Sequence, residues 1–243
     1  MKITQKTTVA LGMACLAAGA LSANAQLYNV NGGLYNSDPT MSGPAILGAN
    51  GDIWNAYNVG WYTWGGQNTV TIADSTGSTS AGVTVDIWNY ITGNLNSGGT
   101  TANPLNLMGN YITSDGSADG WPIKVQIGNL PVSTAFELVV YSAGDGAGQG
   151  GTINLTDSSF STIFASAATT GNSRDLSQGQ GEAYQIFNGT TDSTGNLYFD
   201  VASTTGWHAL NGFQLQVVPE PSTMALGAGG FVLLGLFRRR FTR

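Results

Sequence analysis

Apolar and polar residues alternate along several short stretches in the middle of the chain, and these stretches are rich in β-branched and aromatic residues. A period of two turns one face of a strand to a core and the other face to water. The alternating stretches are 83–87, 123–127, 136–141, 197–201 and 213–217. Each of them predicts a β-strand.

Runs of Gly, Asn, Asp and Ser separate these stretches, for example at 94–99, 144–151 and 171–173. Such residues form turns, because Gly tolerates positive φ and because Asn and Asp hydrogen-bond their own backbone. Only 161–168 indicates a short helix. Many short strands joined by Gly-rich turns predict an all-β body, an antiparallel β-sandwich or jelly roll.

The N-terminal segment 1–25 follows a different pattern, in which two lysines precede an apolar run at 9–20. Small residues then occupy the positions that a signal peptidase requires. The residues that define this cleavage site are Ala23, Ala25 and Gln26. The pattern predicts a secretory signal peptide, handled by the secretion translocon and signal peptidase, rather than the alternative of an uncleaved anchor. Cys15 is the only cysteine and lies in this segment, so the processed chain has no thiol.

The last residues of the chain, 219–243, combine three features. Pro219-Glu220-Pro221 comes first, and proline disfavours helices and central strands, so the motif is expected to be extended and accessible. The uncharged run 224–237 follows and predicts a single short membrane helix, about 21 Å long against a hydrocarbon core of roughly 30 Å. The arginines that close the chain are Arg238, Arg239, Arg240 and Arg243. The positive-inside rule anchors such a cluster in the cytoplasm and leaves the body outside.

This three-part tail resembles the PEP-CTERM sorting signal of Gram-negative bacteria. The resemblance implies that an exosortase recognises the protein in the inner membrane, cuts it near Pro219–Pro221 and releases it to the cell surface or extracellular matrix. It also implies a link to exopolysaccharide and biofilm. A permanent tail anchor with a proline linker is the alternative. The expected organisation is a signal peptide at 1–25, a β-sandwich body at 26–218 and a sorting signal at 219–243.

Charge and loop composition limit the partners of the body. Between Gln26 and Val218 there are two basic residues against thirteen acidic ones, a net charge of −11. Such a surface repels phosphates, so we predict no nucleic-acid partner. The loops Ser114–Gly120 and Ser142–Gly151 supply oxygen ligands of the kind that Ca²⁺ takes, without EF-hand spacing. We interpret them as structural turns and predict no cofactor, with Ca²⁺ as the alternative.

Catalytic sets are sparse. The chain has one histidine, His208, which we interpret as a structural residue, and no Gly-x-Ser-x-Gly motif. A glycosidase needs two carboxylates, and the body has only two glutamates, Glu137 and Glu182, among its acids. We therefore predict a protein that is not an enzyme, with a secreted glycoside hydrolase as one alternative.

A second alternative is a carbohydrate-binding module that stacks sugar rings on aromatic side chains. The candidate residues are Trp54, Tyr57, Trp61 and Trp64. Core packing of Trp54 and Trp61 is the preferred interpretation. The tetrapeptide Asp-Ile-Trp-Asn at 52–55 recurs at 86–89. The stretches 136–151 and 207–218 also resemble the jelly-roll strands of galactose-binding-like modules.

Overall fold

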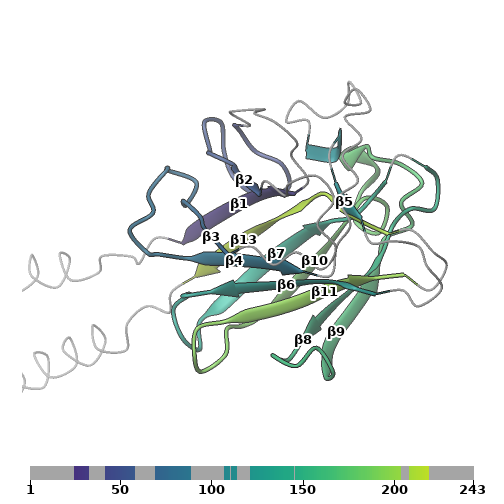
Figure 1. The fold of residues 1–243 in the computed structure, drawn as a ribbon. Helices are drawn as coiled ribbons and strands as arrows, with labels where there is room; N and C mark the ends of the chain where they lie inside the picture. The colour runs from purple at the N-terminus through teal and green to yellow at the C-terminus, as the bar shows by residue number, and fades with distance from the viewer. Residues whose placement is uncertain are drawn as a thin grey trace, which may run out of the picture. The chain divides into compact units, whose positions relative to one another are not determined.

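The computed structural model of the protein describes residues 25–32, 42–57, 69–88, 107–109, 111–113, 121–144, 146–203 and 208–218. These ranges form two large β-sheets, a small two-stranded sheet and two short 3-10 turns (Figure 1). The five-stranded sheet has the order β10 (Tyr184–Thr190), β7 (Ala135–Tyr141), β13 (Gly212–Val218), β1 (Gln26–Gly32) and β2 (Asn55–Tyr57). The six-stranded sheet has the order β3 (Val70–Thr71), β4 (Thr84–Trp88), β6 (Ile123–Gly128), β11 (Leu197–Ala202), β8 (Thr152–Thr156) and β9 (Ile163–Ala168). The remaining elements are the pair β12 (Ala209–Leu210) and β5 (Ile112–Thr113), with the turns η1 (Leu107–Gly109) and η2 (Leu176–Gln178).

The all-β prediction is confirmed, and all five alternating stretches are strands: β4, β6, β7, β11 and β13. Their pairings are antiparallel, but the pairing of β1 with β2 is parallel, with Val30 opposite Asn55. The expectation of a purely antiparallel sandwich is therefore wrong at this edge. The long connection between β1 and β2 brings the chain back in the same direction, as a parallel pair requires.

The predicted helix at 161–168 is wrong. Residues 163–168 form β9, which pairs antiparallel with β8 at the edge of the six-stranded sheet. The Ala-rich sequence has no strong strand preference of its own. The free backbone groups of β8 offer hydrogen bonds that override the weak local tendency to form a helix.

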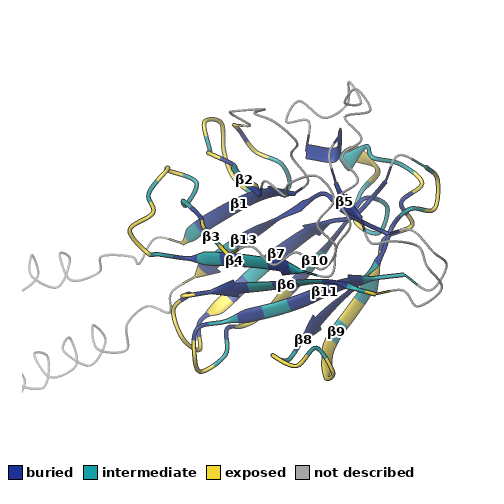
Figure 2. Cartoon of the chain, viewed as in Figure 1, coloured by how far each residue is buried: buried dark blue, intermediate teal, exposed yellow. Residues whose placement is uncertain are grey.

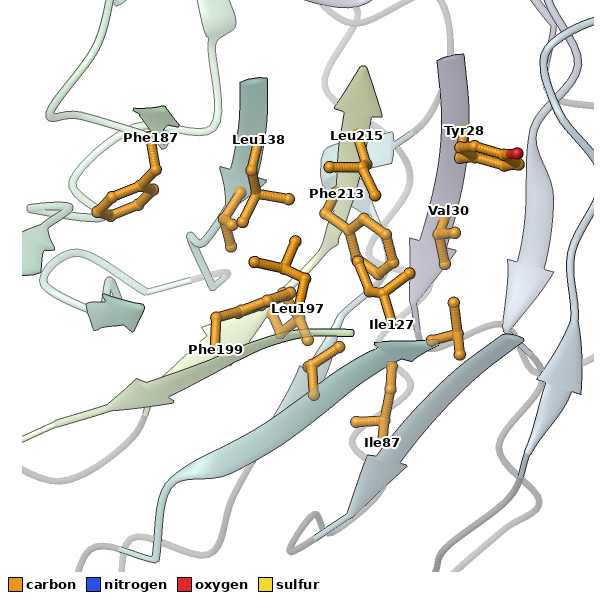
Figure 3. Close-up of a cluster of buried hydrophobic side chains, with 14 of the residues drawn as sticks. Tyr28, Val30, Ile87, Ile127, Leu138, Phe187, Leu197, Phe199, Phe213 and Leu215 are labelled. Carbon is orange, nitrogen blue, oxygen red and sulfur yellow. The ribbon is translucent and has the colours of Figure 1, made fainter. Parts of the chain in front are cut away.

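The main core lies between the two large sheets. Figure 3 shows inward-facing side chains such as Leu138 and Leu215 of one sheet and Ile87 and Ile127 of the other pointing toward one another. Across this core the rings of Phe199 and Phe213 meet edge to face, with 5.7 Å between their centroids. The alternation in the sequence thus has its expected consequence, because the inward positions of both sheets pack into one apolar layer.

A second apolar cluster covers the other side of the five-stranded sheet. Val139 and Tyr141 of β7 and Tyr184 of β10 face outward there, under Trp54 and Met108. Both faces of β7 are consequently buried, although the alternating pattern predicts a polar outer face for this strand. Figure 2 shows β1 and β13 as largely buried strands, whereas β9 is largely exposed.

Of the predicted terminal segments, only Ala25 falls within the described residues. The signal-peptide positions Ala23 and 1–22 and the tail 219–243 lie outside them. Within the ranges that the structure describes, no helix has the length and apolar character that a membrane crossing requires. Residues 26–217 form one compact unit.

Candidate functional site

The sorting motif Pro219, Glu220 and Pro221 lies outside the described residues, as do Arg238, Arg239, Arg240 and Arg243. The structure does describe the residues directly before the motif. Strand β13 ends at Val218, which is 44% exposed, and Pro219 is the next residue in the sequence. The motif therefore starts where the last strand of the body ends.

Two of the four predicted stacking residues are buried. Trp54 is 7% exposed, and its indole N–H donates to the carbonyl oxygen of Gly43 at 2.9 Å. Tyr57 is 1% exposed, and its hydroxyl accepts a hydrogen bond from the backbone N–H of Ile87 at 3.1 Å. Neither ring presents a face to solvent, and Trp54 has the core position that the sequence favours. Trp61 and Trp64 lie outside the described residues.

A different set of aromatic residues lies on the outer face of the six-stranded sheet. Because Val85 and Ile87 of β4 point into the core, their neighbour Trp88 points outward. Lys124 lies opposite Trp88 on β6, and Tyr198 lies on the same face of β11. All three side chains are half-buried.

Phe160, from the turn between β8 and β9, completes this group. Its ring centroid lies 5.5 Å from that of Trp88 and 5.8 Å from that of Tyr198, and it stands nearly perpendicular to both rings. The ammonium of Lys124 lies 4.9 Å from the Phe160 centroid, within cation–π range. We call Trp88, Lys124, Phe160 and Tyr198 the aromatic face.

The turn that carries Phe160 is tightly specified. Phe160 has a φ of 58°, an uncommon backbone conformation for a bulky residue. The side chain of Asp157 holds the turn by accepting hydrogen bonds from the backbone N–H groups of Ser159, Ser161 and Thr162. The turn thus keeps the ring against the sheet despite the backbone strain.

A buried carboxylate lies beside the aromatic face. Asp200 is 6% exposed, and the side-chain amide of Asn154 donates to it at 2.7 Å. Burial raises the pKa of Asp200, while the hydrogen bond from Asn154 and the charge of Lys124 act in the opposite direction. The positive charge of Lys124 thus lies against the Phe160 ring and close enough to Asp200 to favour its ionised form.

The two glutamates weighed as a glycosidase pair are not brought together. Glu137 on β7 is paired with Asn188, whereas Tyr141 at the other end of β7 is paired with Tyr184. Glu182 precedes Tyr184 and accepts a hydrogen bond from the Thr170 hydroxyl at 2.6 Å. Four residues of strand span about 13 Å, which exceeds the separation of about 5–9.5 Å between glycosidase carboxylates.

The described residues contain no group of three or more His, Cys, Asp or Glu side chains that gather as metal ligands do. The loop 142–151 is held by internal hydrogen bonds, such as that from the Gly144 N–H to the Gln149 carbonyl oxygen at 2.9 Å. The second loop weighed for Ca²⁺, 114–120, lies outside the described residues. His208 is 1% exposed.

Comparison with known proteins identifies the C-terminal tail. Residues 217–240 match the family described as the PEP-CTERM protein-sorting motif. The chain carries a PEP-CTERM sorting signal. This match begins in the last two residues of β13 and otherwise covers the tail. No curated protein matches the chain.

Several solved structures are similar to parts of the chain. A family 35 carbohydrate-binding module from Clostridium thermocellum is 14% identical, with a TM-score of 0.34, and the match covers 54% of this chain and 90% of that one. A family 35 module from Cellvibrio japonicus is also 14% identical, with a TM-score of 0.30, over 44% and 72% of the two chains. An isomalto-dextranase from Arthrobacter globiformis, complexed with panose, is 17% identical, with a TM-score of 0.30, over 44% and 18%. Likeness at this level assigns no ligand to the chain.

The sequence analysis does not identify the aromatic face. Trp88 stands in the second Asp-Ile-Trp-Asn tetrapeptide, and its outward direction follows from the alternation in 83–87. Tyr198 is equally an outward position of a predicted strand. Phe160 gives no such signal, because a turn residue acquires its place only when β8 and β9 pair.

Proposed function

We propose that this protein is exported, processed by an exosortase at its PEP-CTERM signal and delivered to the cell surface or extracellular matrix. The match of residues 217–240 to the sorting motif supports this function. The remaining steps follow from the predicted signal peptide and tail. The translocon exports the chain, signal peptidase removes 1–25, and the tail holds the protein transiently in the inner membrane. The mature body then acts at the surface in connection with exopolysaccharide and biofilm.

Intact-mass analysis of the protein released from the cell surface tests both cleavages. We expect a species that lacks residues 1–25 and that ends near Pro219–Pro221. A surface-released chain that still carries Arg243 contradicts the proposal. Glu220→Ala and deletion of 238–243 are each expected to leave the protein in the inner membrane, whereas Glu182→Ala, a matched change in the body, leaves sorting unchanged.

The body has a second candidate function, non-enzymatic binding of extracellular polysaccharide through the aromatic face. The observation that favours it is the gathering of Trp88, Phe160 and Tyr198 on one sheet face, beside Lys124. Aromatic rings offer flat apolar surfaces, and the polar ends of Trp and Tyr can hydrogen-bond to a sugar hydroxyl.

Titration of the purified protein with exopolysaccharide from the producing cells tests this binding. We expect a change in tryptophan fluorescence that Trp88→Ala abolishes while the circular dichroism spectrum is unchanged. Trp121→Ala is the matched control, because Trp121 is 62% exposed and lies outside the aromatic face. An equal loss with both variants indicates unspecific adsorption and contradicts a site at the aromatic face.

A further inference from the structure

A cavity of about 400 Å³ lies beside the aromatic face, between the β8–β9 turn, the end of β10 and the start of β11. Three buried apolar side chains line it: Phe136, Leu155 and Leu197. Its volume falls within the range of about 300–1,000 Å³ that is usual for small-molecule sites. Tyr198 lines the cavity and also belongs to the aromatic face, so the two features adjoin. We call this cavity the hairpin pocket.

A β-bulge supplies an exposed aromatic ring to the hairpin pocket. On β9, Ala165 pairs with Leu155 but Ile163 pairs with Thr156, which leaves Phe164 as an extra residue between the two pairs. A bulge re-aims side chains, and without it Phe164 would be the partner of Thr156. Phe164 instead lines the pocket and is 70% exposed. An exposed aromatic ring at the edge of a cavity offers a flat apolar surface on which a ligand can stack.

A glycine keeps the pocket open on its other side. Gly189 of β10 is opposite Phe136 of β7, and a Cβ on Gly189 would lie 2.7 Å from the Phe136 ring. The bare backbone at Gly189 lets the far end of the Phe136 ring approach β10 closely. Any larger residue would push Phe136 away and alter the apolar lining.

The charged groups that line the pocket limit the kind of ligand that it can hold. Asp157 and Asp192 line it, and its lining contains no Lys, Arg or His. Hydrogen bonds from Ser159 and Thr162 lower the pKa of Asp157. Partial burial raises the pKa of Asp192, but hydrogen bonds from Asn196 and Thr194 outweigh it and lower the pKa overall. Both carboxylates are therefore ionised at neutral pH, which favours hydroxyl donors and disfavours anions.

The geometry points to a second saccharide site, in which the hairpin pocket holds one uncharged sugar unit of a polysaccharide. The sugar stacks on Phe164, and its hydroxyls donate to the carboxylates of Asp157 and Asp192. Asn188 and Asn196 also line the pocket and add amide donors and acceptors. The inference rests on the proposed saccharide-binding function of the body, but it places the ligand at residues distinct from Trp88 and Phe160.

Isothermal titration calorimetry of the full-length protein in detergent tests the pocket. The probe is exopolysaccharide from the producing cells, partially hydrolysed to oligosaccharides and separated by anion exchange into neutral and acidic fractions. We expect the neutral fraction to bind and the acidic fraction to bind at least tenfold more weakly. Phe164→Ala should weaken binding of the neutral fraction about tenfold, while the matched change Val132→Ala, at another exposed apolar residue, leaves it unchanged.

The outcomes separate the pocket from the aromatic face. Loss with Trp88→Ala but not with Phe164→Ala overturns the pocket and leaves the proposed binding function standing. No binding of either fraction overturns both. Preferential binding of the acidic fraction overturns the pocket, because its lining would repel that ligand.

Two further variants distinguish a loss of binding from a loss of folding stability. The carboxylates of Asp192 and Asp74 each accept hydrogen bonds from the backbone N–H groups two and four residues later in the chain. The two turns have nearly identical sequences. Asp192→Asn and Asp74→Asn should therefore lower the unfolding midpoint similarly, but only Asp192→Asn should weaken binding.

Discussion

The outer faces of the two large sheets differ in what lies over them. On the five-stranded sheet, Tyr141 and Tyr184 are covered by Trp54 and Met108, and this outer face is buried, with Asn29 and Gln214 among its buried polar side chains. On the six-stranded sheet, half-buried polar side chains alternate with the inward positions, and the aromatic face lies among them. A strand with two buried faces serves packing, whereas a strand with one uncovered face can also present side chains to a partner.

Gln214 shows how the covered face accommodates polar groups. Its side-chain oxygen accepts hydrogen bonds from the backbone N–H groups of Ile46 and Leu47 and from the Tyr141 hydroxyl, at 3.1, 2.9 and 2.6 Å. Its side-chain nitrogen donates to Asn29 at 2.8 Å. This amide therefore ties residues 45–47, which we call the covering segment, to β13 and β1.

The tetrapeptide Asp-Ile-Trp-Asn, which occurs at 52–55 and 86–89, shows the same difference between the outer faces of the two sheets. In the first copy Trp54 is buried under the covering segment, and in the second copy Trp88 lies half-buried on the uncovered face. The same four residues thus serve packing in one place and surface presentation in the other. Whether the tryptophan is buried or half-buried depends on whether another segment of the chain lies over that face of the sheet.

Truncation of the two tryptophans should show the largest effect. We expect Trp54→Ala to lower the free energy of unfolding by about 3–5 kcal/mol, because it leaves a cavity and the carbonyl oxygen of Gly43 without its donor. Trp88→Ala should cost less than about 1.5 kcal/mol, since it removes one edge-to-face contact. Urea unfolding followed by circular dichroism measures both, and equal losses would remove the proposed distinction between the faces.

Removal of glutamine side chains is the next test. Gln214→Ala should cost about 2–4 kcal/mol, because the Leu47 N–H and the Tyr141 hydroxyl lose their acceptor in a buried site, whereas the Ile46 N–H keeps the Tyr141 hydroxyl oxygen. Gln126→Ala is the control on the uncovered face, where a single 3.3 Å hydrogen bond to Asn196 is lost. We expect a change within about 0.5 kcal/mol there. A similar loss for both variants would show that the covering segment is not held through Gln214.

The effect of acidic pH on folding stability should be smaller, and it should depend on the carboxylates near the six-stranded sheet. The pKa values of Asp157 and Asp192 are lowered on folding, so the stability they contribute is present above about pH 3.9 and is lost as the pH falls through their lowered pKa values. The pKa of Asp200 is raised, so this residue has the opposite sign and gains stability as the pH falls through its raised pKa.

Urea midpoints measured from pH 6 to pH 2 test these signs. Asp157→Asn should flatten the acid loss of stability, and Asp200→Asn should steepen it. The same slope change for the two variants would contradict the opposite shifts in pKa.

Five strands follow from the sequence because their inward positions are apolar and their outward positions are mostly polar. The sequence pattern does not predict β1 and β9, for different physical reasons. β1 carries Asn29 and Asn31, which a local pattern assigns to turns, and their burial depends on partners far along the chain such as Gln214. β9 is rich in alanine and gains its conformation from β8 alone.

The candidate sites are less accessible to sequence analysis than the strands. Trp88 and Tyr198 are outward positions of predicted strands, but nothing local shows that one outer face is covered and the other is not. Phe160 and Phe164 depend on the strained turn and the bulge between β8 and β9, which exist only when these strands pair. The tail is the opposite case, because its recognition depends on the order of short linear features.

The pairing of β1 with β13 has a consequence for export. Gln26 lies opposite Val217, and β13 fills the place between β1 and β7. The first and last strands of the body are thus neighbours, and the middle of the five-stranded sheet stays incomplete until β13 is available to pair with both β1 and β7. On the proposed export route, the five-stranded sheet is therefore completed only after the whole body has been translocated.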